Sequence, residues 1–366
     1  MKSDSPFNAQ AKRQNFLREA LEERRLPSLL VTNLTNIAYL TGFRGSAGVA
    51  LFNPREGVLW VDPRYSLQAQ QEAWGVEVIE ERKGLHKAVG AWLKSNKVRQ
   101  VGYEEVHLTC AEFSRLREGA GGRVKFLPVT GLVEQLRAVK DEEEVARIRG
   151  AGRITVEVFE KVLGSVKPGV AESELVAEIE YQMRKKGAEG AAFETIVASG
   201  ARAALPHARV SRKLLRENEL VIFDLGAILG TYAADMSRTV YVGQPPRRVR
   251  SLYNAVVEAQ EKAVKAALPG VRAGDVDAVA RRSLAGRGLA RLFTHSTGHG
   301  VGLQIHEMPR LGRGEKDRLQ SGHVVTVEPG VYLQGWGGIR VEDTILVAPD
   351  GPEVLTPAPK DKWIVE

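Results

Sequence analysis

Cysteine is almost absent from this chain of 366 residues, because Cys110 is its single example. One cysteine cannot form an intrachain disulfide, and the sequence has no CxxC motif or Cys/His cluster that would hold a structural zinc ion. Long apolar runs are also missing, since no stretch of about 18 apolar residues could cross a membrane. The polar N-terminus lacks the apolar core of a signal peptide. We therefore expect a soluble cytoplasmic protein with no membrane partner.

Motifs for nucleic-acid binding are missing as well, although the chain is basic. The net charge is +7, but the 52 Lys and Arg residues are scattered among 45 Asp and Glu residues. No RNA-recognition, zinc-finger or basic-helix signature gathers the positive charge into one surface. We therefore expect no nucleic-acid partner.

The pattern of apolar residues predicts two domains, which the length of the chain can accommodate. Residues 8–25 show helical spacing that ends before Pro27, and short apolar runs separated by Gly and Pro then alternate with a helical stretch at 85–95. This alternation predicts an α/β domain over residues 1–130. A charged helical connector from about Leu132 leads into a second domain, residues 131–366.

The second domain contains a weak internal repeat. Two Pro-Gly-Val motifs, whose prolines are Pro168 and Pro269, are each followed by a carboxylate and a helical pattern. Each copy continues into an apolar strand, turn, strand pattern that carries two acids. The acids are Asp224 and Asp235 in the first copy, and Glu328 and Glu342 in the second. Two such hairpins facing each other across a pseudo-twofold axis would bring four carboxylates together.

These four carboxylates, with the imidazole of His299, predict a metal site. Ionised carboxylates in one pocket repel each other and lose hydration, so they need cations. Two divalent ions would neutralise them, and we expect Mn, with Co, Zn or Fe as alternatives. Such ions activate a shared water, so the reaction indicated is attack of a metal-bridged hydroxide on a carbonyl group.

Each acid on its own also has a structural explanation. Asp224 could occupy a turn, Asp235 could pair with Arg238, and Glu342 could pair with Arg340. The combined spacing of the acids favours a shared site over these separate explanations.

The motifs resemble those of the pita-bread metallopeptidases, which include Xaa-Pro aminopeptidase, Xaa-Pro dipeptidase (prolidase) and methionine aminopeptidase. The segments that carry the resemblance are ALPHA (204–208), FDLGA (223–227), ADMSRT (234–239), FTHSTGHGVGLQIHE (293–307), VEPGVY (327–332) and GGIRVED (337–343). YLTGFRGSAG (39–48) is similar to the first domain of the proline-specific branch, a domain that methionine aminopeptidases lack. The resemblance implies a creatinase-like α/β domain, a pita-bread α+β domain with the internal repeat, and a homodimer.

The resemblance also implies how the two ions are shared. Asp224 would hold one ion, and Asp235 and Glu342 would bridge both. His299 and Glu328 would complete the second ion.

Further roles follow from the same resemblance. Glu328 would take a proton from the attacking water. His207, His295 and His306 would contact the substrate and stabilise the tetrahedral intermediate. Arg340 would orient the metal-binding carboxylates from behind.

The implied activity is hydrolysis of an Xaa-Pro bond, and we expect a dipeptide substrate. A dipeptide ends in a carboxylate directly after proline, so a nearby cation would favour it over a longer peptide. Arg44, in a loop between Gly42 and Gly45, is the first candidate for that cation, and Arg202 is the second.

Three alternatives stay open. An Xaa-Pro aminopeptidase would act on longer peptides with the same site. A non-catalytic pita-bread binding module and a creatinase-like C–N hydrolase share the fold, but the resemblance implies an incomplete ligand set in both. The five complete ligands here therefore argue against the last two.

Overall fold

The chain divides between Arg137 and Ala138 into two units in the computed structural model, which describes residues 6–365. The boundary expected after residue 130 lies just before helix α6 (Leu132–Ala138), which ends at this division. No helix in the described part of the chain is long and apolar enough to cross a membrane.

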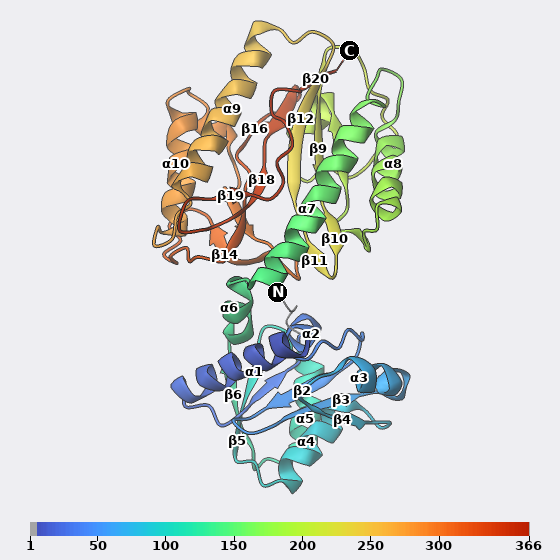
Figure 1. Ribbon diagram of the computed structural model, residues 1–366, viewed down its shortest axis with the longest axis vertical. Coiled ribbons are helices and arrows are strands. Elements are labelled where there is room, and N and C mark those ends of the chain that lie inside the picture. Colours follow the sequence, from blue (N-terminus) through green and yellow to red (C-terminus); the bar gives the residue numbers. More distant parts are fainter. Residues whose placement is uncertain (1–5, 366) are drawn as a thin grey trace. The chain divides into compact units, whose positions relative to one another are not determined.

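The first unit is built on a mixed six-stranded sheet (Figure 1). Its strands follow the order β4–β3–β2–β1–β5–β6, in which β2 is antiparallel to both of its neighbours and the other neighbours are parallel. The short apolar runs of the sequence form these strands, which are β1 (Leu29–Val31), β2 (Val49–Phe52), β3 (Gly57–Val61), β4 (Glu77–Glu80), β5 (Gln100–Glu104) and β6 (Lys125–Val129).

Helices connect and cover the strands of this sheet, as the alternation in the sequence predicted. They are α1 (Pro6–Glu23), α2 (Leu34–Thr41), the 3₁₀ turn η1 (Pro63–Tyr65), α3 (Ser66–Glu72), α4 (Leu85–Ser95) and α5 (Cys110–Ala120). Leu17 and Leu21, one helical turn apart on α1, are fully buried, so this helix packs through the face that its spacing indicated.

The charged connector consists of two helices instead of one. Helix α6 ends at Ala138, and α7 (Glu142–Leu163) begins after Asp141, which caps it. Between the two, Val139 forms an isolated antiparallel bridge with His323. This pairing draws the backbone out of the helical conformation, so the helix stops and restarts.

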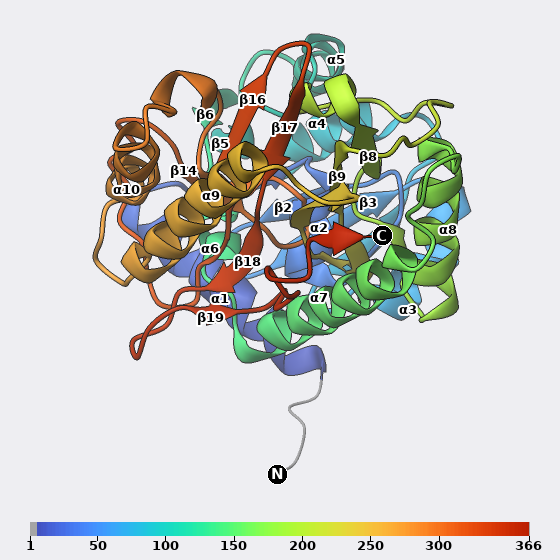
Figure 2. The same ribbon diagram turned by 90° about the horizontal axis from the view of Figure 1, so that it is seen from above.

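The second unit contains two halves of similar build, as the internal repeat predicted. In each half a pair of helices packs against strands, and the strands of both halves lie between the two helix pairs (Figures 1 and 2). The pairs are α7 with α8 (Glu172–Lys185), and α9 (Arg247–Ala266) with α10 (Ala273–Ala285).

Two sheets belong to each half. Those of the first half have the orders β20–β12–β9–β8 and β11–β10–β7, and those of the second β14–β13–β15–β18–β19 and β16–β17. The first-half elements are β7 (Gly190–Ala191), β8 (Ile196–Ser199), the 3₁₀ turn η2 (Gly200–Ala204), β9 (Glu219–Leu225), β10 (Ala227–Leu229), β11 (Tyr232–Ala233), β12 (Met236–Val242) and β20 (Ile364–Val365). The second-half elements are η3 (Ala290–Leu292), β13 (Gly298–Gly300), β14 (Glu307–Leu311), β15 (Val324–Val327), β16 (Gly330–Leu333), β17 (Gly337–Arg340), β18 (Asp343–Leu346) and β19 (Glu353–Val354).

Each predicted hairpin is an outer strand pair that continues into an inner pair. In the first half β9 pairs with β12, and β10 pairs with β11. In the second half β15 pairs with β18, and β16 pairs with β17. The regular ladder is interrupted between the outer and inner pairs, and the predicted acids lie at these interruptions.

Candidate metal centre

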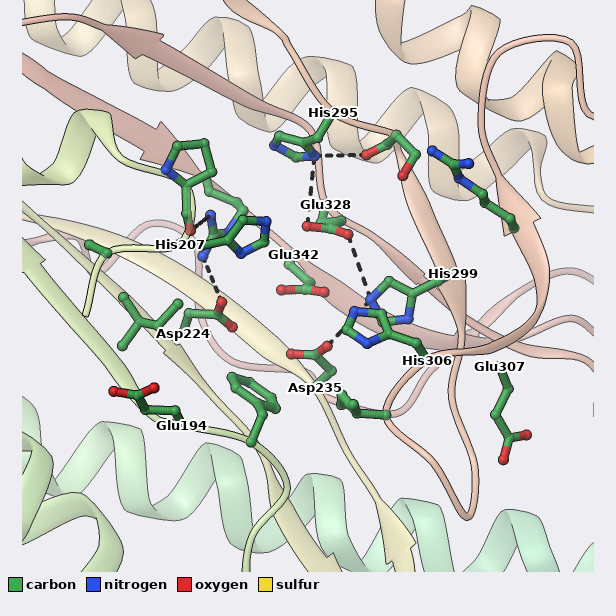
Figure 3. A pocket seen from close by; sticks show the side chains of 18 of the residues that line it. Glu194, His207, Asp224, Asp235, His295, His299, His306, Glu307, Glu328 and Glu342 are labelled. Atoms are coloured by element: carbon green, nitrogen blue, oxygen red, sulfur yellow. Dashed lines mark hydrogen bonds and ion pairs between the residues drawn. The ribbon is translucent and has the colours of Figure 1, made fainter. Parts of the chain in front are cut away.

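Four acidic side chains lie where the outer strand pairs end. Asp224 is the next-to-last residue of β9, and Asp235 directly precedes β12. In the other half Glu328 directly follows β15, and Glu342 directly precedes β18. All four line one cavity of about 580 Å³ (Figure 3). The structure thus brings together acids that are far apart in the sequence.

Asp235, His299 and Glu342 form a close group within this cavity. Each offers one ligand atom, and these atoms lie within 4.8 Å of one another. His299 Nε2 also lies 3.7 Å from Asp235 Oδ2 and 3.7 Å from Glu328 Oε1. Four of the five predicted ligands are therefore close neighbours, with His299 between two of the acids.

The acids are held in a setting that opposes their ionisation. Burial, reinforced by the neighbouring carboxylates, raises the pKa of Asp235 and of Glu328 well above the usual range. The same causes, burial first and Asp224 second, raise the pKa of Glu342 to about 8. The Arg340 guanidinium lowers all three pKa values but does not cancel the effect of burial. The protein alone therefore does not supply enough positive charge for this cluster.

Unpartnered oxygen atoms in the cluster fit metal ions. Within residues 6–365, Oδ1 of Asp224, Oδ1 of Asp235 and Oε1 of Glu342 are buried without a hydrogen-bond donor. Buried acceptors of this kind are rare in folded proteins. Divalent cations would satisfy these oxygens and neutralise the carboxylates, and a set of carboxylates with one imidazole suits Mn, Co, Zn or Fe.

The Arg340 guanidinium orients two of the acids. Its Nη2 lies 2.7 Å from Asp224 Oδ2, and its Nε–H donates to Ser237 Oγ at 2.8 Å. The Ser237 hydroxyl in turn donates to Glu342 Oε2 at 2.7 Å. The direct partner of Arg340 is thus Asp224, in the other half of the repeat. Glu342, which is two residues away in sequence, is reached through Ser237 and does not simply pair with Arg340.

Arg238, considered as a structural partner for Asp235, pairs elsewhere. Its Nη2 lies 2.6 Å from Asp343 Oδ1, and Lys360 Nζ lies 2.7 Å from the other oxygen of Asp343. Arg238 Nη1 also donates to the backbone carbonyl of Glu342. The Arg238 guanidinium therefore bonds to Asp343 and to the backbone of Glu342, and not to Asp235.

Glycines let the strand that carries His299 approach its neighbours closely. A Cβ atom at Gly298 would lie 1.9 Å from the carbonyl oxygen of Thr326, and one at Gly300 would lie 2.2 Å from that of Met308. Any larger residue at either position would force the strands apart. Gly298 and Gly300 therefore allow the close strand packing that places His299 beside the acids.

The ring of His299 presents a free lone pair to the acids. Its Nδ1 lies 3.1 Å from the Gly300 carbonyl oxygen, which can only accept, so the proton of the neutral ring belongs on Nδ1. Burial, and then the charge of nearby His306, lower the pKa of His299 to about 4. The neutral ring with Nε2 facing Asp235 and Glu328 is the form that can bind a metal ion.

His295 is fixed through both ring nitrogens. Its Nδ1 lies 2.8 Å from the carbonyl oxygen of Ser296, and its Nε2 lies 2.9 Å from Tyr332 Oη. Because Arg340 donates to Tyr332 Oη at 3.0 Å, the tyrosine proton is free to be donated to His295 Nε2. Burial lowers the pKa of His295 to about 4, in keeping with this neutral form. His295 Nδ1 also lies 4.0 Å from Glu328 Oε2.

His207 and His306 are exposed residues that line the same cavity. The His306 ring centroid lies 4.2 Å from that of His299, and the partial desolvation of the ring at the cavity wall lowers the pKa of His306. Within the described part of the chain, no hydrogen bond or ion pair of the His207 ring is present. Both rings therefore keep N–H groups available to a substrate.

Four further residues of the site were missed in the sequence. Ser237 and Tyr332 lie inside recognised motifs, but Ser237 acts through contacts with Glu342 and Arg340 in the other half, and Tyr332 through contacts with His295 and Arg340 elsewhere in its own half. Glu194 and Arg310 line the cavity and carry no motif signal. Arg310 faces His299 across the β13–β14 pair.

The glycines beside Arg44 have local explanations. Gly42 has a φ of +87° and caps the end of α2, and a Cβ at Gly45 would lie 2.1 Å from the buried ring of Phe43. The Arg44 side chain is exposed, and its backbone N–H donates to Glu72 Oε2 at 3.0 Å. These contacts concern the first unit alone, so a role for Arg44 in substrate selection stays a prediction.

Comparison with known proteins identifies two family regions. Residues 146–349 match the model of metallopeptidase family M24, and residues 13–139 match that of the creatinase/prolidase N-terminal domain. An Xaa-Pro dipeptidase of Pyrococcus horikoshii is 34% identical over 340 residues, covering 92% of this chain and 95% of the relative.

Two solved structures are similar over almost the whole chain. An Xaa-Pro dipeptidase from Bacillus anthracis has a TM-score of 0.93 and 37% identity, and the match covers 97% of this chain and 99% of that one. An X-Pro aminopeptidase from Thermotoga maritima has a TM-score of 0.86 and 36% identity, with coverage of 95% and 100%. Structures of both peptidase types are thus close to this fold.

Proposed function

The chain belongs to metallopeptidase family M24, as its motifs predicted, and on this premise we propose that it cleaves the Xaa-Pro bond of dipeptides with two divalent metal ions. The observation that carries the proposal is the cavity in which acids from both halves of the repeat meet His299. A metal-dependent peptidase is a stronger conclusion than a binding module, because the relatives include peptidases and none of the five ligands is missing.

Five residues would hold the ions. Asp235 and Glu342 would be shared, Asp224 would complete the first ion, and His299 and Glu328 would complete the second. The unpartnered oxygens of the acids support this assignment. When bound, such ions lower the pKa of a water toward about 7 and polarise the peptide carbonyl.

The side chains around the ions would move protons and stabilise charge. Glu328, whose pKa is raised by burial, is suited to take a proton from the attacking water and to hand it to the proline nitrogen as the bond breaks. His207 and His306 can each donate an N–H to the oxygen on which negative charge develops. The bonds from Tyr332 and Ser296 hold neutral His295 beside Glu328.

The cavity also has features that suit a dipeptide. A dipeptide carries an ammonium group at one end and a carboxylate at the other, and the lining includes Glu194 and Arg310. Within residues 6–365, the guanidinium of Arg310 has no carboxylate partner. Phe193, Ile196 and Ile305 line the same cavity and offer apolar surface for the proline ring.

Arg310→Gln is expected to raise KM for Ala-Pro by roughly 10- to 100-fold, which corresponds to one lost charge-assisted hydrogen bond. The effect on a longer Xaa-Pro peptide should be smaller, because its carboxylate lies elsewhere. Steady-state kinetics on both substrates measure this. Arg209→Gln removes another exposed cavity arginine and serves as the matched control, and Arg44→Ala tests the candidate from the sequence. If Arg44→Ala alone changes the ratio of the two activities, Arg310 is not the selector.

Removal and return of metal ions tests the proposed function as a whole. The chelated protein is expected to release no proline from Ala-Pro, and Mn should restore the activity better than Co, Zn or Fe. Comparison with a longer Xaa-Pro peptide, the substrate of the alternative aminopeptidase, decides between the two activities. Absence of hydrolysis of both substrates with every ion would refute the enzyme proposal. A homodimer and a cytoplasmic location stay predictions.

A further inference from the structure

The loop between β8 and β9 carries His207, one of the exposed cavity histidines. Because nothing within residues 6–365 bonds to the His207 ring, the backbone of this loop sets the position of the imidazole. The backbone carbonyl of Pro206 accepts a hydrogen bond from Arg340 Nη1 at 3.1 Å. This bond fixes the residue before His207. The segments on either side, near Ser199 and Ser211, are held by other bonds.

Glu172, the first residue of α8, makes these bonds from a fully buried position. Its Oε1 accepts from the backbone N–H and the hydroxyl of Ser199, each at 2.8 Å. Its Oε2 accepts from the Ser211 hydroxyl at 2.6 Å and from Arg202 Nε at 3.0 Å. One carboxylate therefore joins Ser199, at the start of the loop, to Ser211, four residues after His207.

Arg202 closes the loop from within. Its Nε–H donates to Glu172, and its Nη2 donates to the backbone carbonyl of Arg209. The second bond links Arg202, five positions before His207, to a residue two positions after it. The planar guanidinium can make both bonds at once, whereas the single ammonium group of a lysine has a different geometry. Arg202 is thus engaged in the loop and does not offer a free cation to the substrate.

The other half of the repeat holds its histidine segment in a comparable way. Asp277 on α10 is buried and accepts from the backbone N–H and the hydroxyl of Thr297, at 3.1 and 2.8 Å. Arg281, four residues further on, makes two bonds to Asp277 and donates to the carbonyl oxygens of His295 and Phe293. A helix carboxylate and an arginine therefore fix a substrate-facing segment in each half.

We infer that Arg202 is a positioning residue, which with Glu172 fixes the backbone on both sides of His207 and so places the imidazole for the substrate. The inference rests on the proposed function, because it takes His207 to contact the substrate. Arg202→Ala leaves Glu172 with three donors from Ser199 and Ser211, so the fold is expected to survive the substitution.

A double-mutant cycle on the full-length, metal-loaded protein tests this role. Arg202→Ala is expected to lower kcat/KM on the preferred Xaa-Pro substrate by roughly 10- to 100-fold, as a displaced catalytic group does. In a His207→Ala background the same change should cost less than about threefold, because there is no imidazole left to position. An equal loss in both backgrounds would show that Arg202 does not act through His207.

Hydrogen exchange supplies a readout that does not depend on hydrolysis. The backbone amides of residues 203–205 and 207–209 are expected to exchange at least about tenfold faster in Arg202→Ala than in the wild-type protein, and Pro206 has no amide hydrogen. Arg149→Ala is the matched control, because it removes another arginine with two hydrogen bonds, both of them to the carboxylate of exposed Glu353. Unchanged exchange in Arg202→Ala would overturn the inference even if the protein hydrolyses no Xaa-Pro bond, whereas faster exchange in a protein without hydrolysis would refute the proposed function alone.

Discussion

Replacing Asp235 with asparagine is expected to empty both metal positions and to lower kcat/KM by at least about 10³-fold, since activation of the water is lost with the ions. Asp235 lies in the close group with His299 and Glu342, and one of its oxygens is buried without a donor. Asparagine offers a single carbonyl oxygen and places an NH₂ group where the second oxygen stood. It can therefore neither bridge two cations nor neutralise them.

Asp224→Asn is the matched control for this prediction. Asp224 already shares one oxygen with Arg340 at 2.7 Å, and it stands outside the close group formed by Asp235, His299 and Glu342. This variant is expected to lose mainly one ion, so elemental analysis should find about one metal per chain, against none for Asp235→Asn. Thermal unfolding of both metal-free variants checks that the fold is intact. Two ions per chain in the Asp235 variant would refute the shared role of Asp235.

The acids of the site could be found in the sequence because the fold repeats. Two hairpins of the same pattern carry Asp224 with Asp235 and Glu328 with Glu342, and spacing along the chain is enough to align them. The two-domain architecture was predictable for a similar reason, since strands and helices leave periodic patterns in the sequence. A repeated hairpin and an alternating pattern of strands and helices can both be recognised from the sequence without a structure.

Which side chains bond to each other could not be predicted in this way, because these bonds join segments that are distant in the sequence. Arg340 was placed beside Glu342 by sequence, yet its direct partner is Asp224, 116 residues away. Ser237 resembles any other serine until its hydroxyl is seen between Arg340 and Glu342. The glycines around Arg44 suggested a flexible reach, but Gly42 caps a helix and Gly45 packs on Phe43.

The metal-free protein is expected to lose stability as the pH rises from about 7.5 to about 9. Burial raises the pKa of Glu342 to about 8, so the folded chain holds a proton that the unfolded chain releases above about pH 4.5. The folded state therefore binds more protons than the unfolded state, and the free energy of unfolding falls as pH rises. For one such group the loss between pH 7.5 and 9 is about 1 kcal/mol.

The buried histidines limit the pH range in which the effect of the acids on stability can be measured. Burial lowers the pKa of His295, His299 and His323 to about 4, whereas an unfolded histidine has a pKa near 6.5, so each still takes up part of a proton on unfolding until about pH 7.5. Their contribution to stability rises with pH and is nearly complete at about pH 7.5, which masks the opposite trend of the acids at lower pH. Above about pH 7.5 the acids dominate, and Tm should fall by roughly 2 to 4 °C by pH 9.

Calorimetry of the chelated protein between about pH 7.5 and pH 9 measures this slope, and two variants identify its source. Glu342→Gln removes one of the three acids with a raised pKa and is expected to reduce the slope, whereas Glu353→Gln changes an exposed acid and should leave it intact. Adding Mn should also remove the slope, because a cation takes the place of the bound protons and its affinity rises with pH. A slope that is the same in Glu342→Gln and in the wild-type protein would mean that Glu342 does not hold one of these protons, and the electrostatic need for cations at this acid would then lose its main support.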